Sequence, residues 1–189
     1  KNSNIGSLNI NKADCNVCKN TGEYAEWKQY SREWGSVPLG NSGETIKSAG
    51  CLVTSLAIQV ARSGVPTNIS GEFNPGTFVQ AMNKIGAFDN GGSFVRYANV
   101  QKVASRFKYE NYISLSGKSK QDKLNTIKSI VNQNGVYAIA EVKGGSGGQH
   151  WVAIDRVNGD IISMFDPGIK ATDMWKEYKY YNTSKIVYY

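Results

Sequence analysis

The chain has 189 residues, of which 40% are hydrophobic, and this length and composition fit one globular domain with at most a modest extension. Its formal net charge of +7 favours an acidic environment, such as a nucleic acid, an anionic membrane or a bacterial wall that carries phosphate polymers. The lysines are scattered, without the dense block or zinc-finger spacing of a nucleic-acid-binding protein. No apolar run approaches the roughly 18 residues of a membrane span. We therefore expect neither nucleic-acid binding nor a membrane span.

The first residues, 1–22, are polar and show little periodicity, which indicates an N-terminal extension that packs on the domain or is partly disordered. The domain itself is predicted to occupy residues 23–189. The extension lacks the hydrophobic region of a signal peptide, and the chain begins at Lys1. We expect a leader or neighbouring domains to have been removed, so that the chain is part of a larger protein.

The extension also carries two of the three cysteines, Cys15 and Cys18, in a C-x-x-C motif. This spacing suits a metal knuckle or a redox pair, but no second C-x-x-C or paired histidines supply the rest of a four-ligand zinc site. A short disulfide or two unreactive thiols is the preferred interpretation. We expect no metal and no cofactor.

Residues 24–45 are aromatic at first and then rich in Gly, Asn and Ser, which predicts a short helix or extended piece followed by a loop. From Cys51 onward, Leu52, Leu56 and Val60 recur at four-residue steps, which predicts a buried helix that ends near Gly64. Cys51 then lies in the first turn of this helix.

Two further helices are predicted at residues 75–85 and 120–134, from apolar stripes at helical spacing. After Gly135 the pattern changes to strands at 136–142, 150–157 and 160–167, and the tail 185–189 suggests one more. Residues 171–181 fit either a short helix or an irregular segment. Helices followed by an antiparallel sheet predict an α+β domain.

The only histidine, His150, opens the strand HWVAIDRV after a glycine-rich turn. Asp166 ends the next strand, in the motif FDPG. A hairpin that turns at 158–159 places residues near Ile154 opposite residues near Ser163 and brings His150 close to 165–167. Asp166 is therefore predicted to reach the imidazole. The alternatives are a histidine with a purely structural role and an aspartate that only forms the turn before Pro-Gly.

Cys51 has a chemical reason to lie where it does. A helix N-terminus carries unpaired amides and a partial positive charge, which favour a thiolate over a thiol, and a nearby imidazolium adds to this effect. Gly50 would let a substrate approach the backbone closely. Cys51, His150 and Asp166 together supply a nucleophile, a base and a group that orients the base. The alternative is a cysteine that only packs in the core.

The order of WKQYSREWGSVPLG, SAGCLVTSLAI, GGQHWVAID and FDPG resembles the bacterial papain-like cysteine peptidases related to the double-glycine-leader peptidases of bacteriocin exporters. The resemblance runs from about Tyr24 to the C-terminus. It implies a papain-like fold, in which a helical part with the nucleophile at a helix N-terminus packs on a C-terminal antiparallel sheet. It also implies that Cys51 is the nucleophile, His150 the general base and acid, and Asp166 the orienting residue.

The resemblance further implies an oxyanion hole made by the Gln29 side chain and the backbone amide of Cys51. In papain the glutamine lies a few residues before the cysteine, where this chain has Thr45. Gln149, beside the histidine, is a rival for the same role. The chain also reads LVTS after Cys51, where relatives often have a Gly-Pro pair, and it has no ATP-binding or transport segment.

The expected function is hydrolysis of an amide bond in a peptide through an acyl-enzyme on Cys51, with bacterial cell-wall peptide as one candidate substrate. Such an enzyme would be secreted or associated with the cell wall, and would be encoded by a bacterium or a phage. A transglutaminase, deamidase or acyltransferase uses the same three groups, because the cleft chooses the acyl acceptor. A third possibility is a binding module for cell wall or carbohydrate, which would use some of the tryptophans, although core packing accounts for at least two of them: Trp27, Trp34, Trp151 and Trp175.

Overall fold

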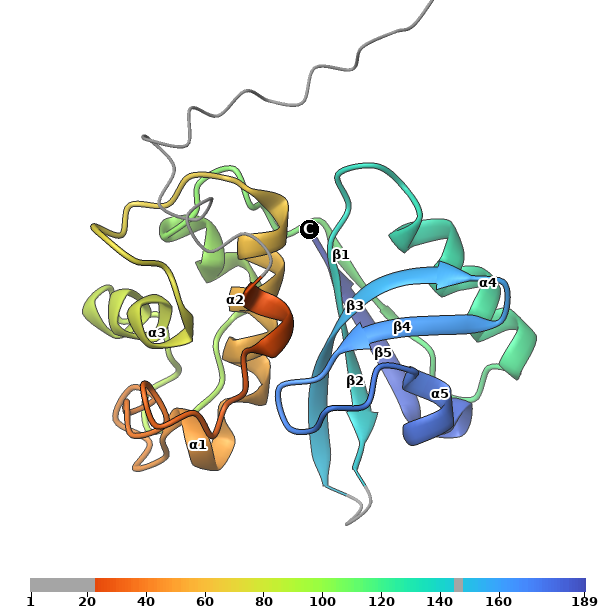
Figure 1. Cartoon of the computed structure of the whole chain (residues 1–189), viewed down its shortest axis with the longest axis horizontal. Coiled ribbons are helices and arrows are strands. Elements are labelled where there is room, and N and C mark those ends of the chain that lie inside the picture. Colours follow the sequence, from red (N-terminus) through yellow and green to blue (C-terminus); the bar gives the residue numbers. More distant parts are fainter. Residues whose placement is uncertain (1–22, 145–147) are drawn as a thin grey trace, which may run out of the picture.

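The structure is a computed structural model that describes residues 23–144 and 148–189. The predicted extension 1–22, with Cys15 and Cys18, lies outside the described residues. The fold is α+β, with a five-stranded antiparallel sheet and several helices. Figure 1 shows a helical part packed on one side of the sheet. Among the described residues, none of the helices has the length and apolar character needed to cross a membrane.

The strands of the sheet lie in the order β1-β5-β2-β3-β4. Each strand pairs antiparallel with its neighbours. The predicted strands are present, and the C-terminal tail forms a strand at the sheet interior. The first strand was not predicted, because it is a short edge strand with mostly exposed residues and no apolar alternation. The bounds are β1 Asn111–Ser114, β2 Ala138–Lys143, β3 Gln149–Asn158, β4 Ile161–Phe165 and β5 Thr183–Tyr188.

The three long helices match the predicted ones closely: α2 Cys51–Ser63, α3 Pro75–Lys84 and α4 Lys120–Val131. A short helix, α1 (Ile46–Ala49), precedes α2, in a stretch for which the sequence predicted no element. The segment left open at 171–181 contains the short helix α5 (Met174–Glu177). The described residues also contain 3-10 helices at η2 Glu23–Glu26, η3 Tyr97–Lys102 and η4 Tyr180–Asn182.

The order of helices first and sheet second holds only in part. The edge strand β1 precedes α4 in the chain, and α4 covers the sheet face opposite to α2 (Figure 1). The sheet is therefore covered on both faces, and each face has its own apolar cluster. Alternation along β3 decides which side chains join which cluster, because Trp151 and Ala153 face the helical part whereas Val152 and Ile154 face α4.

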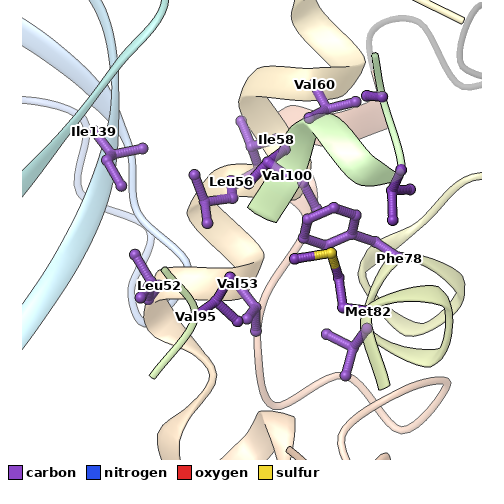
Figure 2. Packing of buried hydrophobic residues seen from close by; sticks show 14 of the residues in the cluster. Leu52, Val53, Leu56, Ile58, Val60, Phe78, Met82, Val95, Val100 and Ile139 are labelled. Atoms are coloured by element: carbon purple, nitrogen blue, oxygen red, sulfur yellow. The ribbon is translucent and has the colours of Figure 1, made fainter. Parts of the chain in front are cut away.

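The helix α2 forms the centre of the helical part, since every residue from 52 to 61 is buried. Figure 2 shows its side chains between Ile139 of the sheet and Phe78 and Met82 of α3. Each fully buried aliphatic side chain of this kind contributes about 2 kcal/mol to folding. Packing on all sides fixes the position of α2, and with it the position of Cys51 at its N-terminus.

Candidate active site

Hydrogen bonds from α2 to β3 set the helix along this strand. The hydroxyl of Ser55 donates to the carbonyl oxygen of Trp151 at 3.1 Å, and Nε2 of Gln59 donates to the carbonyl oxygen of Ile154 at 2.8 Å. Both donors lie on the same helix face as Cys51, because they follow it by one and two turns. Since Ser55 meets the residue after His150, Cys51 is directed to the beginning of β3.

Gly50 connects α1 to α2, and the surrounding backbone leaves no room for a side chain at this position. A Cβ atom at this position would lie 2.3 Å from the carbonyl oxygen and 2.6 Å from the Cα atom of Ile46. The close approach at Gly50 is thus made by the protein's own backbone, one turn earlier, whereas the sequence suggested approach of a substrate. The junction lets α2 start anew at Cys51 instead of continuing α1.

His150 and Asp166 form a hydrogen-bonded pair, with 2.8 Å between Nε2 of His150 and Oδ1 of Asp166. The histidine side chain is 17% exposed, and that of the aspartate is fully buried. The pairing of β3 with β4 sets this arrangement, with Ile154 opposite Met164, within one residue of the predicted register. The hairpin turns at 159–160, one residue later than predicted, because Asn158 pairs with Ile161, and a bulge at Asp155 offsets part of the resulting change in register.

Asp166 also forms the turn before Pro-Gly, which the sequence analysis gave as the alternative to a role beside the histidine. Its Oδ1 accepts hydrogen bonds from the backbone amides of Gly168 at 2.7 Å and Ile169 at 3.3 Å. Burial alone would raise the pKa of Asp166, but the hydrogen bond and charge of His150, together with the other donors, hold it below its ordinary value. The turn therefore keeps a carboxylate, rather than a carboxylic acid, against the imidazole.

Cys51 lies close enough to the imidazole that its hydrogen bond and its charge both raise the pKa of His150. Burial would lower the pKa of His150, but the hydrogen bonds to Asp166 and Cys51 and the charges of both raise it to about 9. Since Nε2 is taken by Asp166, Nδ1 is the ring nitrogen that remains for the thiol. Cys51 is a free cysteine and is partly exposed. Its interaction with His150, together with the hydrogen bond between His150 and Asp166, links the three predicted residues through the imidazole.

Gln29 is held between the turn of Asp166 and the helix that leads into Cys51. Its backbone amide donates to the carbonyl oxygen of Pro167 at 2.9 Å, and its side-chain Nε2 donates to the carbonyl oxygen of Lys47 at 3.1 Å. Lys47 stands four residues before Cys51, so its carbonyl is the one that a continuous helix would use for the amide of Cys51. As the first residue of α2, Cys51 has a backbone N–H without an acceptor inside that helix.

The two other positions considered for the oxyanion donor have different partners. The side-chain amide of Gln149 donates to Oε2 of Glu141 on the neighbouring strand β2. Thr45 is the N-cap of α1, where its hydroxyl accepts from the backbone amide of Ser48 at 3.3 Å. Both side chains are thus hydrogen-bonded to partners outside the candidate triad.

Three residues at the site were not found by sequence reasoning. The hydroxyl of Tyr178 donates to Oδ2 of Asp166. The ammonium group of Lys28 donates to the carbonyl oxygen of Asp166 at 2.6 Å. A Cβ atom on Gly168 would lie 3.2 Å from Cε1 of His150. No periodicity or motif marks Tyr178 or Lys28, whereas Gly168 stood within the quoted motif FDPG and was taken only as a turn residue.

A cavity of about 280 Å³ adjoins the imidazole, and Tyr178 and Glu177 form part of its lining together with His150 and Gly168. Larger cavities of about 490 and 580 Å³ occur in the helical part, but Cys51, His150 and Asp166 line neither of them. A further cavity of about 320 Å³ is lined by Asp166 and Lys28, so cavities adjoin both members of the His–Asp pair.

Within residues 23–144 and 148–189, no three His, Cys, Asp or Glu side chains gather in a way that could hold a metal ion. The sequence was also compared with known proteins. No model of a known protein family matches the chain. No curated protein matches it at a significant level.

Proposed function

We propose that the protein is a papain-like cysteine peptidase that hydrolyses an amide bond in a peptide. The observation that carries the proposal is the imidazole of His150, which is hydrogen-bonded to the buried carboxylate of Asp166 and interacts with Cys51. A thiol beside an imidazole whose other nitrogen is held by a carboxylate is the arrangement that activates a cysteine nucleophile. The expected reaction class is acyl transfer to water.

In the proposed reaction, the thiolate of Cys51 attacks the carbonyl carbon of the scissile amide, and the carbonyl oxygen becomes negatively charged. The imidazolium of His150 then gives its proton to the leaving amine as the C–N bond breaks, which leaves a thioester on Cys51. The neutral imidazole next takes a proton from water, which attacks the thioester and releases the carboxylic acid. Asp166 keeps the ring in the orientation that both proton transfers need.

Gln29 and the backbone amide of Cys51 are the proposed donors to the negatively charged oxygen. One of the two amide hydrogens of Gln29 binds the carbonyl oxygen of Lys47, and the second can serve the oxyanion. A preorganised donor of this kind lowers the barrier by about 3 kcal/mol. The contact with Lys47 supports this role, because it fixes the amide group next to the residues that lead into Cys51.

We propose bacterial cell-wall peptide as the substrate class to test first, and a secreted or wall-associated location, within a longer chain that contains other domains. The net charge of +7 supports this choice, because bacterial walls carry phosphate polymers of opposite charge. The same charge would also draw the protein to other acidic surfaces, so the experiment must compare wall peptides with ordinary peptides.

The test is incubation of the protein with purified cell-wall fragments and with a mixed peptide library, followed by mass spectrometry of the products. We expect new cut peptides with the wild type and none with Cys51→Ala. A gain of one dalton would instead indicate deamidation, and a cross-linked or acylated product would indicate transfer to another acceptor. Turnover that survives Cys51→Ala would refute the proposed nucleophile, and binding to cell wall without any turnover would favour a binding module.

A further inference from the structure

Tyr178, the residue that directly follows α5, contacts the candidate triad. Its hydroxyl donates to Oδ2 of Asp166, and its ring lies 5.7 Å from the ring of His150, centroid to centroid. The side chain is only 7% exposed. One residue therefore touches both members of the His–Asp pair, and it does so from inside the protein.

The four acceptor contacts of Asp166 divide between its two oxygens. Oδ1 receives His150, Gly168 and Ile169, whereas Oδ2 receives Tyr178. Without the tyrosine hydroxyl, one oxygen of a fully buried carboxylate would have no donor among the described residues, and only the three contacts on Oδ1 would hold the carboxylate in place. The tyrosine thus helps to fix the plane of the carboxylate against the imidazole.

Hydrogen bonds of the neighbouring residues fix the position of Tyr178. The backbone amide of Tyr178 bonds to Met174 at 2.8 Å, and the indole of Trp175 donates to the hydroxyl of Thr183 at 2.9 Å, so both α5 and the start of β5 anchor the segment. Directly after the tyrosine, Lys179 has φ 63° and ψ 148°. It is the one described residue other than glycine with positive φ, and such a conformation costs on the order of 1–3 kcal/mol.

We infer that Tyr178 is a positioning residue for the proposed reaction: by holding Oδ2 of Asp166, it keeps Oδ1 on the imidazole and so keeps His150 in its reactive orientation. The inference rests on the proposed function, because it concerns the same triad. It goes beyond that function in assigning a role to a residue outside the three reacting groups.

Several charged and titratable groups surround the His150–Asp166 pair, and they decide which measurement can detect the effect of Tyr178. His150 approaches Asp166 from β3, Lys28 binds its backbone carbonyl, Cys51 interacts with the imidazole, and Glu177 precedes the tyrosine. The hydrogen bond from Tyr178 helps to keep the pKa of Asp166 low. Its loss is therefore expected to raise the pH at which Asp166 takes up a proton, and the single histidine reports that event in an NMR titration.

The experiment compares Tyr178→Phe with Tyr189→Phe. Tyr189 is also buried, and its hydroxyl also makes one hydrogen bond, at 2.7 Å to the carbonyl oxygen of Tyr97, but it does not contact the triad. We expect Tyr178→Phe to lower kcat about tenfold without a change in KM, and to move the acid-side midpoint of the His150 ring resonances up by about one pH unit. Tyr189→Phe should change neither. Equal behaviour of the two variants would overturn the inference.

The NMR readout needs no substrate, which separates the inference from the proposed function. If hydrolysis is never found but the His150 midpoint moves only in Tyr178→Phe, the positioning role stands and the proposed function fails. If hydrolysis is found and Tyr178→Phe leaves both kcat and the midpoint unchanged, the proposed function stands and the positioning role of Tyr178 fails. Should Tyr178→Phe not fold, the wild type provides the test: a slowly exchanging Tyr178 hydroxyl proton that Asp166→Asn removes supports the role, and its absence overturns it.

Discussion

The hydroxyl of Ser55 donates a hydrogen bond of 3.1 Å to the carbonyl oxygen of Trp151, and this contact ties the helix of the nucleophile to the strand of the base. Ser55 lies one turn after Cys51, and Trp151 directly follows His150. A hydrogen bond between these neighbours restricts how far the thiol and the imidazole can move apart. The two halves of the candidate site are thus joined by a buried contact as well as by their own interaction.

We expect Ser55→Ala to lower the free energy of unfolding by about 1–2 kcal/mol, because a buried carbonyl loses a donor. It should also lower the rate of peptide hydrolysis, since α2 can then shift along β3. Chemical denaturation and steady-state kinetics measure the two effects. Ser63→Ala is the matched control, because the hydroxyl of Ser63 bonds to Val60 within the same helix. Equal losses of activity in both variants would contradict the proposed link.

The neighbouring residue Thr54 offers the opposite effect on stability. Its hydroxyl is buried, and among the described residues it has no hydrogen-bond partner. A buried hydroxyl without a partner destabilises the native state, and valine has nearly the same shape without the polar group. Thr54→Val is therefore expected to raise the free energy of unfolding by about 1 kcal/mol, as measured by urea denaturation. A loss of stability instead would show that the hydroxyl is satisfied.

Gly168 packs against the His–Asp pair so closely that even a methyl group would disturb it. An added Cβ atom would lie 3.2 Å from Cε1 of His150 and 3.3 Å from Oδ1 of Asp166. We expect Gly168→Ala to shift the imidazole by a few tenths of an ångström and to lower kcat about tenfold, with little change in the melting temperature. Gly92→Ala, with its nearest contact at 3.4 Å on Asp89, is the control. Full activity of Gly168→Ala would mean that the ring tolerates the displacement.

The pH dependence follows from the pKa of His150. Burial lowers this pKa, but hydrogen bonds to Asp166 and Cys51 raise it from 6.5 to about 9 in the folded protein. Because the folded value is the higher one, protonation of His150 stabilises the native state fully below about pH 6.5, and this contribution is lost as the pH rises through about 9. NMR titration of the single histidine should give a midpoint near pH 9, and Asp166→Asn should lower it. A wild-type midpoint at the ordinary value would be inconsistent with the ion-paired site.

Much of the fold was predictable because strong local patterns matched the final structure. The four-residue spacing after Cys51 predicted α2, and the alternation after Gly135 predicted β2, β3 and β4. The edge strand β1 and the short helix α1 carry no such pattern, since four residues are too few to show a period. Their existence depends on tertiary contacts, such as the pairing of β1 with β5.

The candidate site divides in the same way. Cys51 and His150 could be named because cysteine and histidine are rare in the chain, and Asp166 because it ends the strand predicted to pair with the strand of His150. Tyr178 could not be named, because eleven tyrosines occur in the chain and only folding shows which one reaches the carboxylate. The sequence also could not show why residue 50 is a glycine, since a Cβ atom at this position would meet the backbone of Ile46.

The central claim is that His150 makes Cys51 reactive, and the rate of alkylation of Cys51 by iodoacetamide at pH 6 tests it most directly. Peptide mapping by mass spectrometry separates Cys51 from Cys15 and Cys18, and no substrate is needed. An imidazolium beside the thiol favours the thiolate, which is the form that reacts. We predict that Cys51 is alkylated about tenfold faster or more in the wild type than in His150→Gln. Equal rates in the two proteins would contradict the claim.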